Sequence, residues 1–114
     1  MITKGPAKRL NIYIDETDKF HGKPVYEVLL DIFFKNKIIG VSVFRGIAGY
    51  GSDGVFHTAK MLELSTSLPL KIEAVDSADM IESVMPDVYR VVEKGFIDVS
   101  ETIVVKCCKK NQDN

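Results

Sequence analysis

Four segments alternate apolar and polar residues, which is the pattern of half-buried β-strands. In the first, Leu10, Ile12 and Ile14 alternate with polar neighbours as far as Asp15. The expected strands are the segment ending near Asp15, a segment from Gly40 through Val41, Val43 and Phe44, the segment from Leu70 to Val75, and the segment from Val99 to Cys107. The spacing within these segments predicts a sheet that is apolar on one face.

Two other segments have the three- and four-residue spacing of amphipathic helices. The first begins at Pro24, and its apolar stripe is Val25, Val28, Leu29, Ile32 and Phe33. The second is expected from about Ala78 to Lys94, with the stripe Ile81, Val84, Met85, Val88 and Val92. Asp76 or Ser77 can cap it, Gly95 suits its C-terminal end, and Pro86 should kink or split it.

The elements follow the order βαββαβ, which predicts an α+β ferredoxin-like sandwich with a four-stranded antiparallel sheet and both helices on one face. A length of 114 residues suits one domain spanning 1–114. The other sheet face would lack cover and would present apolar surface, so self-association is expected.

Composition narrows the classes of partner. Fifteen basic and sixteen acidic residues give a formal net charge of −1, which predicts binding neither to nucleic acid nor to an anionic membrane. The apolar runs are strand-sized, so we expect a cytoplasmic protein without membrane insertion. The adjacent Cys107 and Cys108 are interpreted as ordinary thiols at a strand end.

The expected second strand ends at Arg45 in a glycine-rich loop, and no strand or helix pattern returns until about Leu70. Gly46, Gly49 and Gly51 can adopt backbone conformations closed to other residues, so their N–H groups could converge on an anion beside Arg45. Alternatively, the glycines only turn the chain, and Arg45 pairs with an acidic neighbour across a subunit interface. Tyr50 is a candidate for stacking on a nucleotide base, or else an exposed loop aromatic or partner contact.

Lys71 and Glu73 are two residues apart on the expected third strand, so they share a face and form either an ion pair or a ligand contact. His21 and His57 are interpreted as polar loop residues, and no metal site is predicted. No catalytic residues are predicted either. Acylphosphatase shares this topology, but its arginine loop would fall between Asp15 and Lys23, where this chain has no arginine.

The chain resembles the PII-like signalling proteins, specifically a small bacterial family catalogued as a domain of unknown function. The resemblance covers about residues 8–106. It is carried by the segments Leu10 to Ile14, Lys19 to Pro24 with Tyr26 and Glu27, Gly40 to Gly51, and Pro69 to Glu73. It implies a homotrimer with ATP, ADP or AMP as effector in the clefts between subunits. It also implies a mobile loop over about residues 46–68, equivalent to the T-loop of PII proteins, that docks onto a transporter or enzyme.

The resemblance therefore implies regulation, not catalysis. It places Arg45 and Gly46 at the root of the T-loop, and Lys71 to Glu73 at the start of the third strand. The loop lacks the tyrosine that some classical members modify, and residues 93–98 lack their longer glycine-rich phosphate loop. The alternative is a ligand-free trimeric docking subunit that contacts its partner through Phe56, Met61 and Leu62.

Overall fold

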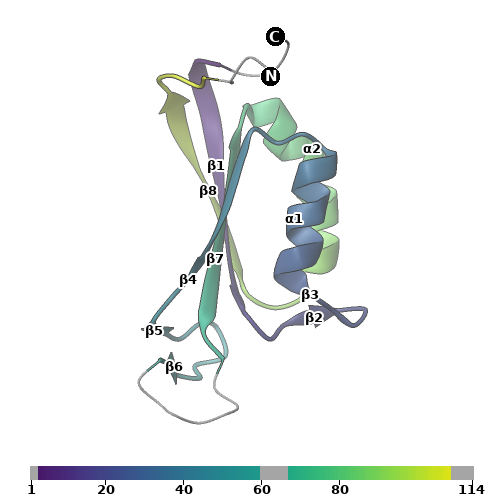
Figure 1. Cartoon of the computed structure of the whole chain (residues 1–114), viewed down its shortest axis with the longest axis vertical. Coiled ribbons are helices and arrows are strands. Elements are labelled where there is room, and N and C mark those ends of the chain that lie inside the picture. Colours follow the sequence, from purple (N-terminus) through teal and green to yellow (C-terminus); the bar gives the residue numbers. More distant parts are fainter. Residues whose placement is uncertain (1–2, 60–66, 109–114) are drawn as a thin grey trace.

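The computed structural model describes residues 3–59 and 67–108, and these form a four-stranded antiparallel sheet covered on one face by two helices (Figure 1). The sheet strands are β1 (Gly5–Asp15), β4 (Gly40–Arg45), β7 (Pro69–Asp76) and β8 (Phe96–Val104). Their order across the sheet is β4-β7-β1-β8. The predicted ferredoxin-like sandwich is confirmed.

The two helices are α1 (Val25–Lys35) and α2 (Ala78–Val91), and both lie on the same side of the sheet (Figure 1). Two short hairpins add to this core. One consists of β2 (Lys19–Phe20) and β3 (Lys23–Pro24) and leads into α1; the other consists of β5 (Ala48–Gly49) and β6 (His57–Thr58). Figure 1 shows the second hairpin beyond the end of the sheet that is opposite to the two termini. In the described part of the chain, neither helix has the length and apolar character needed to cross a membrane.

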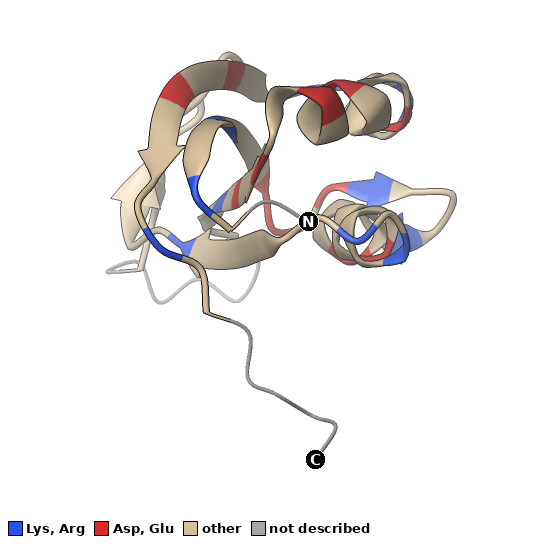
Figure 2. Cartoon of the chain, turned by 90° about the horizontal axis from the view of Figure 1, so that it is seen from above, with Lys and Arg blue, Asp and Glu red and all other residues tan. Residues whose placement is uncertain are grey.

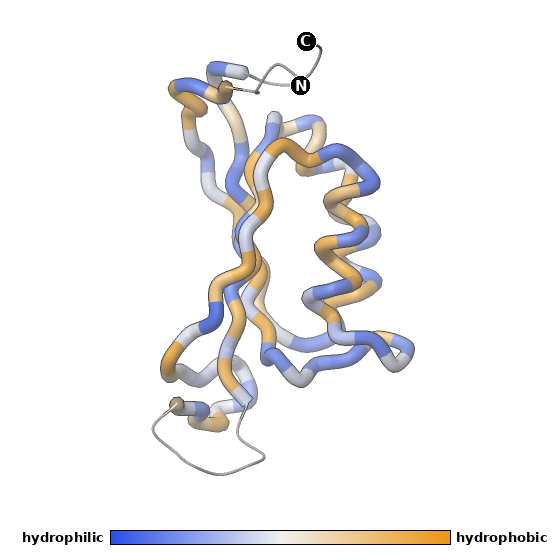
Figure 3. The backbone as a smooth tube through the Cα atoms, in the orientation of Figure 1, coloured by the Kyte–Doolittle hydropathy of each residue, from blue (hydrophilic) through white to orange (hydrophobic). Residues whose placement is uncertain are grey.

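The core lies between the sheet and the helices. Buried and partly exposed residues alternate along the strands, so one face of the sheet supplies the core. In β7 the residues Leu70, Ile72 and Ala74 are buried, while the residues between them are partly exposed. The apolar stripes of both helices meet them, with Leu29 and Phe33 fully buried from α1. Figure 3 shows the corresponding alternation of apolar and polar positions along the strands. Burial of these side chains at about 25 cal/mol per Å² is the main stabilising contribution to the fold.

The fourth strand differs from its predicted bounds. We expected Val99 to Cys107, but β8 begins at Phe96 and ends at Val104. Its pairing with β1 runs from Tyr13 opposite Phe96 to Gly5 opposite Val104, so the partner strand sets both ends.

The end of the second helix also differs from the expectation. The helix stops at Val91, so Gly95 does not terminate it. Gly95 instead has φ +132° in the turn into β8, where an added Cβ would lie 2.5 Å from the carbonyl oxygen of Tyr13. Pro86 does not split the helix, which runs through it, and Ser77 caps the N-terminus by accepting a hydrogen bond from the Met80 N–H at 3.3 Å.

The helix-free face is less apolar than predicted. In its middle Arg9 pairs with Glu73 at 2.8 Å, and the Asn11 side-chain amide donates to Asp98 at 2.8 Å. The aromatic side chains of Tyr13, Phe44 and Phe96 lie on this face in one register, toward the end of the sheet where β4 leads into the β5–β6 hairpin. This face is therefore polar in its middle and aromatic toward one end, and self-association stays a prediction.

Candidate functional site

A cleft of about 460 Å³ lies where β4 leaves the sheet, which is within the size range of small-ligand pockets. It brings together six of the seven predicted site residues from β4, the glycine-rich segment and β7. These are Arg45, Gly46, Gly49, Tyr50, Gly51 and Lys71. The seventh, Glu73, does not line the cleft. Its carboxylate lies between Arg9 and Lys71, at 2.8 Å and 3.4 Å.

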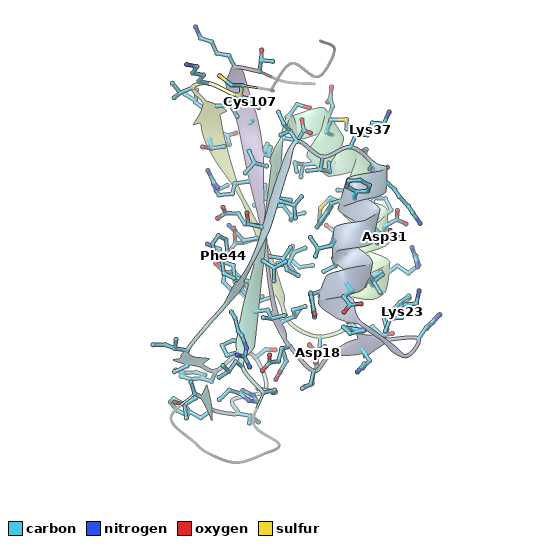
Figure 4. The ribbon with its side chains drawn as sticks, viewed as in Figure 1. Asp18, Lys23, Asp31, Lys37, Phe44 and Cys107 are labelled. Atoms are coloured by element: carbon cyan, nitrogen blue, oxygen red, sulfur yellow. The ribbon has the colours of Figure 1, made fainter. Side chains whose placement is uncertain are left out.

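Sequence reasoning missed the aromatic part of this cleft. Tyr13 of β1, Phe44 of β4 and Phe96 of β8 line it from three strands. Phe44, labelled in Figure 4, lies on the side of the sheet away from the helices. Tyr13 occupied a polar position in the alternation, and Phe96 fell before the expected start of the fourth strand. Only the pairing of their strands, which brings the three residues into one register, could have revealed them.

Arg45 is bound by a carboxylate of its own chain. Its Nε and Nη2 donate to the two carboxylate oxygens of Glu16 at 2.9 and 3.0 Å, a bidentate pair. We had expected either an anion or an acidic partner across a subunit interface, and the structure shows an intramolecular partner. Any anion that binds the guanidinium must share it with Glu16 or displace that carboxylate.

The same carboxylate also holds the returning end of the loop. Glu16 accepts a hydrogen bond from the Leu68 N–H at 2.6 Å, and the Glu16 N–H donates to the Leu68 carbonyl at 3.0 Å. The hydrogen bonds from Arg45 lower the pKa of Glu16 and outweigh the opposing effect of burial, while Glu16 raises the pKa of Arg45. We call Glu16, Arg45, Gly46, Leu68 and Pro69 the loop root.

The glycines do not act as expected. Gly46, Gly49 and Gly51 have no positive φ, and the Gly46 N–H already donates to the Pro69 carbonyl at 2.7 Å. The backbone at Gly46 passes close to Pro69, and an added Cβ would lie 3.0 Å from Cγ of Pro69. The position therefore favours glycine. The expectation of left-handed glycines presenting several N–H groups to an anion is therefore wrong.

A second carboxylate fastens the loop through β6. Nε2 of His57 lies 3.3 Å from the Asp15 carboxylate, and Nδ1 lies 3.4 Å from the Ser67 hydroxyl. Burial would raise the pKa of Asp15, but hydrogen bonds from Ser67 and Thr17 and the nearby His57 leave it lowered. These residues are far apart in sequence, so His57 was interpreted only as a polar loop residue.

Asp15, His57 and Ser67 are also the residue types of a hydrolase triad, which sequence reasoning did not find. However, Ser67 is only 6% exposed, and its hydroxyl also hydrogen-bonds to Asp15. The arrangement therefore serves as a structural tie between the loop and the end of β1.

The remaining cations near the cleft each have an acidic neighbour. Lys71 lies 3.4 Å from Glu73, and Lys94 lies 3.5 Å from Asp18. Figure 2 shows basic and acidic residues interspersed over the chain. Within residues 3–59 and 67–108, no three His, Cys, Asp or Glu side chains are grouped so that they could hold a metal ion.

Cys107 and Cys108 lie beyond the end of β8 and are both free thiols. The Cys107 N–H donates to the Thr3 carbonyl at 3.0 Å. Figure 4 shows Cys107 at the end of the molecule opposite to the loop, so these thiols are remote from the cleft.

The order of the strands and the two helices on one face of the sheet match the fold of PII-like proteins. The chain belongs to the DUF190 family, described as "Uncharacterized ACR, COG1993", whose model matches residues 7–104. It is 39% identical over 101 residues to a UPF0166 protein of Methanocaldococcus jannaschii, covering 88% of this chain and 93% of the relative. It is 32% identical over 98 residues to a UPF0166 protein of Aquifex aeolicus, covering 86% and 92%.

Solved structures confirm the PII-like fold. CPII, a nitrogen regulatory PII-like protein from Thiomonas intermedia, was crystallised with ADP, AMP and bicarbonate. It superposes with a TM-score of 0.64 at 18% identity, over 93% of this chain and 94% of CPII. A Thermus thermophilus protein described as PII-like gives a TM-score of 0.58 at 15% identity, over 91% and 94% of the chains.

Proposed function

We propose that this protein is a cytoplasmic PII-like regulator that binds an adenine nucleotide, or a related phosphorylated metabolite, and signals through residues 46–68. In this proposal the ligand lies in clefts between the subunits of a homotrimer, and ATP, ADP or AMP is the effector. The observation that carries the proposal is the cleft at the loop root, which combines cationic and aromatic side chains from all four strands of the main sheet. The ADP and AMP bound to CPII, which has the same fold, support the choice of ligand.

The phosphate is assigned to Arg45, which lines the cleft together with the second predicted cation, Lys71. Guanidinium groups form bidentate hydrogen bonds to phosphate as they do to carboxylate. A phosphate can therefore take the place of the Glu16 carboxylate on Arg45. The side chain of Arg45 is 61% exposed, so an anion can reach it without opening the core. Glu73 acts on the ligand indirectly in this scheme, because it neutralises Lys71 at 3.4 Å.

The loop root gives the ligand a way to influence the loop. Glu16 binds Arg45, where the loop begins, and the Leu68 N–H, where it ends. A phosphate that draws Arg45 away removes one of the two partners of this carboxylate. The ligand then shifts the loop between conformations in proportion to its differential affinity for them. Residues 60–66 of this loop lie outside the described residues.

Calorimetric titration of the wild-type protein with ATP, ADP, AMP and cyclic nucleotides tests the proposal. We expect saturable binding of at least one of them and a loss of about 10-fold or more in affinity for Arg45→Ala, since a charge-assisted pair is removed. Arg90→Ala is the matched control. Arg90 also pairs with a carboxylate, Asp87 at 3.0 Å, and is similarly exposed, but it does not line the cleft. The absence of heat with every ligand would reject nucleotide binding.

A second candidate is a ligand-free docking subunit that presents the loop to a transporter or enzyme. It is favoured by the exposure of Tyr50 and Phe56, whose rings pack against each other with centroids 5.0 Å apart. Met61 and Leu62, which we also expected at this contact, lie outside the described residues. Co-purification with and without residues 47–58 separates the candidates, since unchanged capture of every partner would reject docking through this segment.

A further inference from the structure

We propose that one row of side chains across the sheet binds the planar base of a purine nucleotide. The row consists of Phe44, Lys71, Tyr13 and Phe96 and is called the aromatic row below. This inference rests on the proposed function, because it names the part of the same cleft that recognises the base.

The strand register places these four side chains side by side. Phe44 of β4 is opposite Lys71 of β7, Lys71 is opposite Tyr13 of β1, and Tyr13 is opposite Phe96 of β8. Residues directly opposite each other on neighbouring strands project from the same face. Since strands are about 4.8 Å apart, Phe44 and Phe96 lie roughly 14 Å apart, with Lys71 and Tyr13 between them. All four line the cleft.

In a single copy of the chain, the row is exposed on the face that has no helices. Tyr13, Phe44 and Phe96 keep 39%, 50% and 56% of their surface accessible. The Tyr13 and Phe96 rings contact edge to face with centroids 5.7 Å apart, and Nζ of Lys71 lies 6.0 Å from the Tyr13 centroid. The backbone is built around this contact, because Gly95 lets the chain preceding Phe96 pass close to the Tyr13 carbonyl.

The chemistry of the row fits a flat heterocycle that carries hydrogen-bond acceptors. Aromatic faces stack on bases, and the Lys71 ammonium can donate to a ring nitrogen beside the stack. Arg45 lines the same cleft at the end of β4, so the phosphate joined to the base through its sugar can reach the loop root. A base with an attached anion therefore complements the cleft better than an apolar ligand does.

Tyr50 was the aromatic residue that the sequence offered for base stacking. In the structure it belongs to the β5–β6 region, where its ring already packs against Phe56. The aromatic row instead lies on the main sheet. If the row binds the base, substitutions in the row weaken base recognition and a substitution of Tyr50 does not; if Tyr50 binds the base, the reverse holds.

The experiment compares AMP with ribose 5-phosphate, which keeps the phosphate and sugar but lacks the base. We expect wild-type protein to bind AMP on the order of 10-fold more tightly, and Tyr13→Leu and Phe96→Leu to remove most of this difference. Their affinity for ribose 5-phosphate should be unchanged, which also shows that the variants are folded. Phe34→Leu is the matched control, because Phe34 is 84% exposed on α1, outside the cleft.

Three results would overturn the inference. If the wild-type protein binds AMP but both row variants keep the full preference over ribose 5-phosphate, the row does not contact the base. If only Tyr50→Leu removes the preference, the loop carries the base. If the row variants change the oligomeric mass and leave the preference intact, the row is a contact between copies. Failure of the wild-type protein to bind either compound would reject the proposed function together with this inference.

Discussion

Arg45 and Glu16 illustrate how one pair of residues can connect a ligand to a loop. The guanidinium is already neutralised by the carboxylate, with two hydrogen bonds of 2.9 and 3.0 Å. The free energy that Arg45 contributes to phosphate binding is therefore the difference between its contact with the phosphate and its contact with Glu16. A site of this kind binds less tightly than an unpaired arginine would, and it releases a carboxylate on binding.

Replacing Glu16 should tighten anion binding. In Glu16→Gln the competing negative charge is gone, so we expect the affinity for ADP to rise on the order of 5-fold, within the usual range of coupling energies. Calorimetric titration measures it. Asp31→Asn is the control, because Asp31 also pairs with a basic residue, Lys35 on α1 at 2.9 Å, but does not line the cleft. An affinity equal to that of the wild type would show that Glu16 does not compete with the ligand.

The two carboxylates at the end of β1 should make stability depend on acid pH. The pKa values of Asp15 and Glu16 are lower in the folded protein than their ordinary values of 3.8 and 4.5. Between the folded and unfolded pKa the unfolded chain binds more protons, so stability rises with pH there. The contribution is complete above about pH 4.5 and is lost as the pH falls through the folded pKa values.

Urea denaturation between pH 7 and pH 3 of wild type and Glu16→Gln measures this dependence. We expect the wild type to be the more stable protein at pH 7 and the difference to shrink below about pH 4.5. Glu82→Gln, on the exposed side of α2, controls for the loss of one carboxylate. A difference that is constant over the whole range would contradict the assigned role of Glu16.

At the scale of elements, the turn between α2 and β8 positions one wall of the cleft. Gly95 has φ +132°, and its backbone approaches Tyr13 so closely that no side chain fits. We expect Gly95→Ala to lower the free energy of unfolding by about 1–3 kcal/mol, through strain and the clash together. Gly51→Ala is the control, because Gly51 has no positive φ and an added Cβ there meets nothing within 4 Å. Equal stability of the two variants in urea denaturation would show that the turn is not constrained.

The elements themselves could largely be predicted from the sequence. Periodicity located β1, β4, β7 and both helices because one face of each packs against the core, and residues on that face set the pattern. The limits of β8 could not be predicted, because its ends depend on the register with β1. The short hairpins were missed as well, since strands of two residues have no readable period.

The site could be predicted only in part, for a related reason. The cluster around Arg45 is contiguous in sequence, so its residues were found together. The partners Glu16 for Arg45 and Asp15 for His57 are brought close only by folding, and the aromatic row needs all four strands in register. Sequence spacing carries no information about such contacts.

At the scale of the whole molecule, the proposal requires several copies of the chain. The helix-free face is open in one copy, polar in its middle and aromatic at the loop end. We expect light scattering coupled to gel filtration to give three times the 12.7 kDa of the chain at micromolar concentration. A monomeric mass that persists in the presence of ADP would remove the shared cleft from the account, although a cleft within one chain would remain.

The central claim is that the cleft at the loop root holds a nucleotide, and a crystal structure of the protein grown with ADP tests it most directly. The account predicts density for the base against Tyr13 and Phe96, and for phosphate at Arg45, with the Arg45–Glu16 distances longer than 2.9 and 3.0 Å. Crystals grown at saturating ADP with no nucleotide in the cleft, or with nucleotide bound elsewhere and the Arg45–Glu16 pair intact, would contradict it.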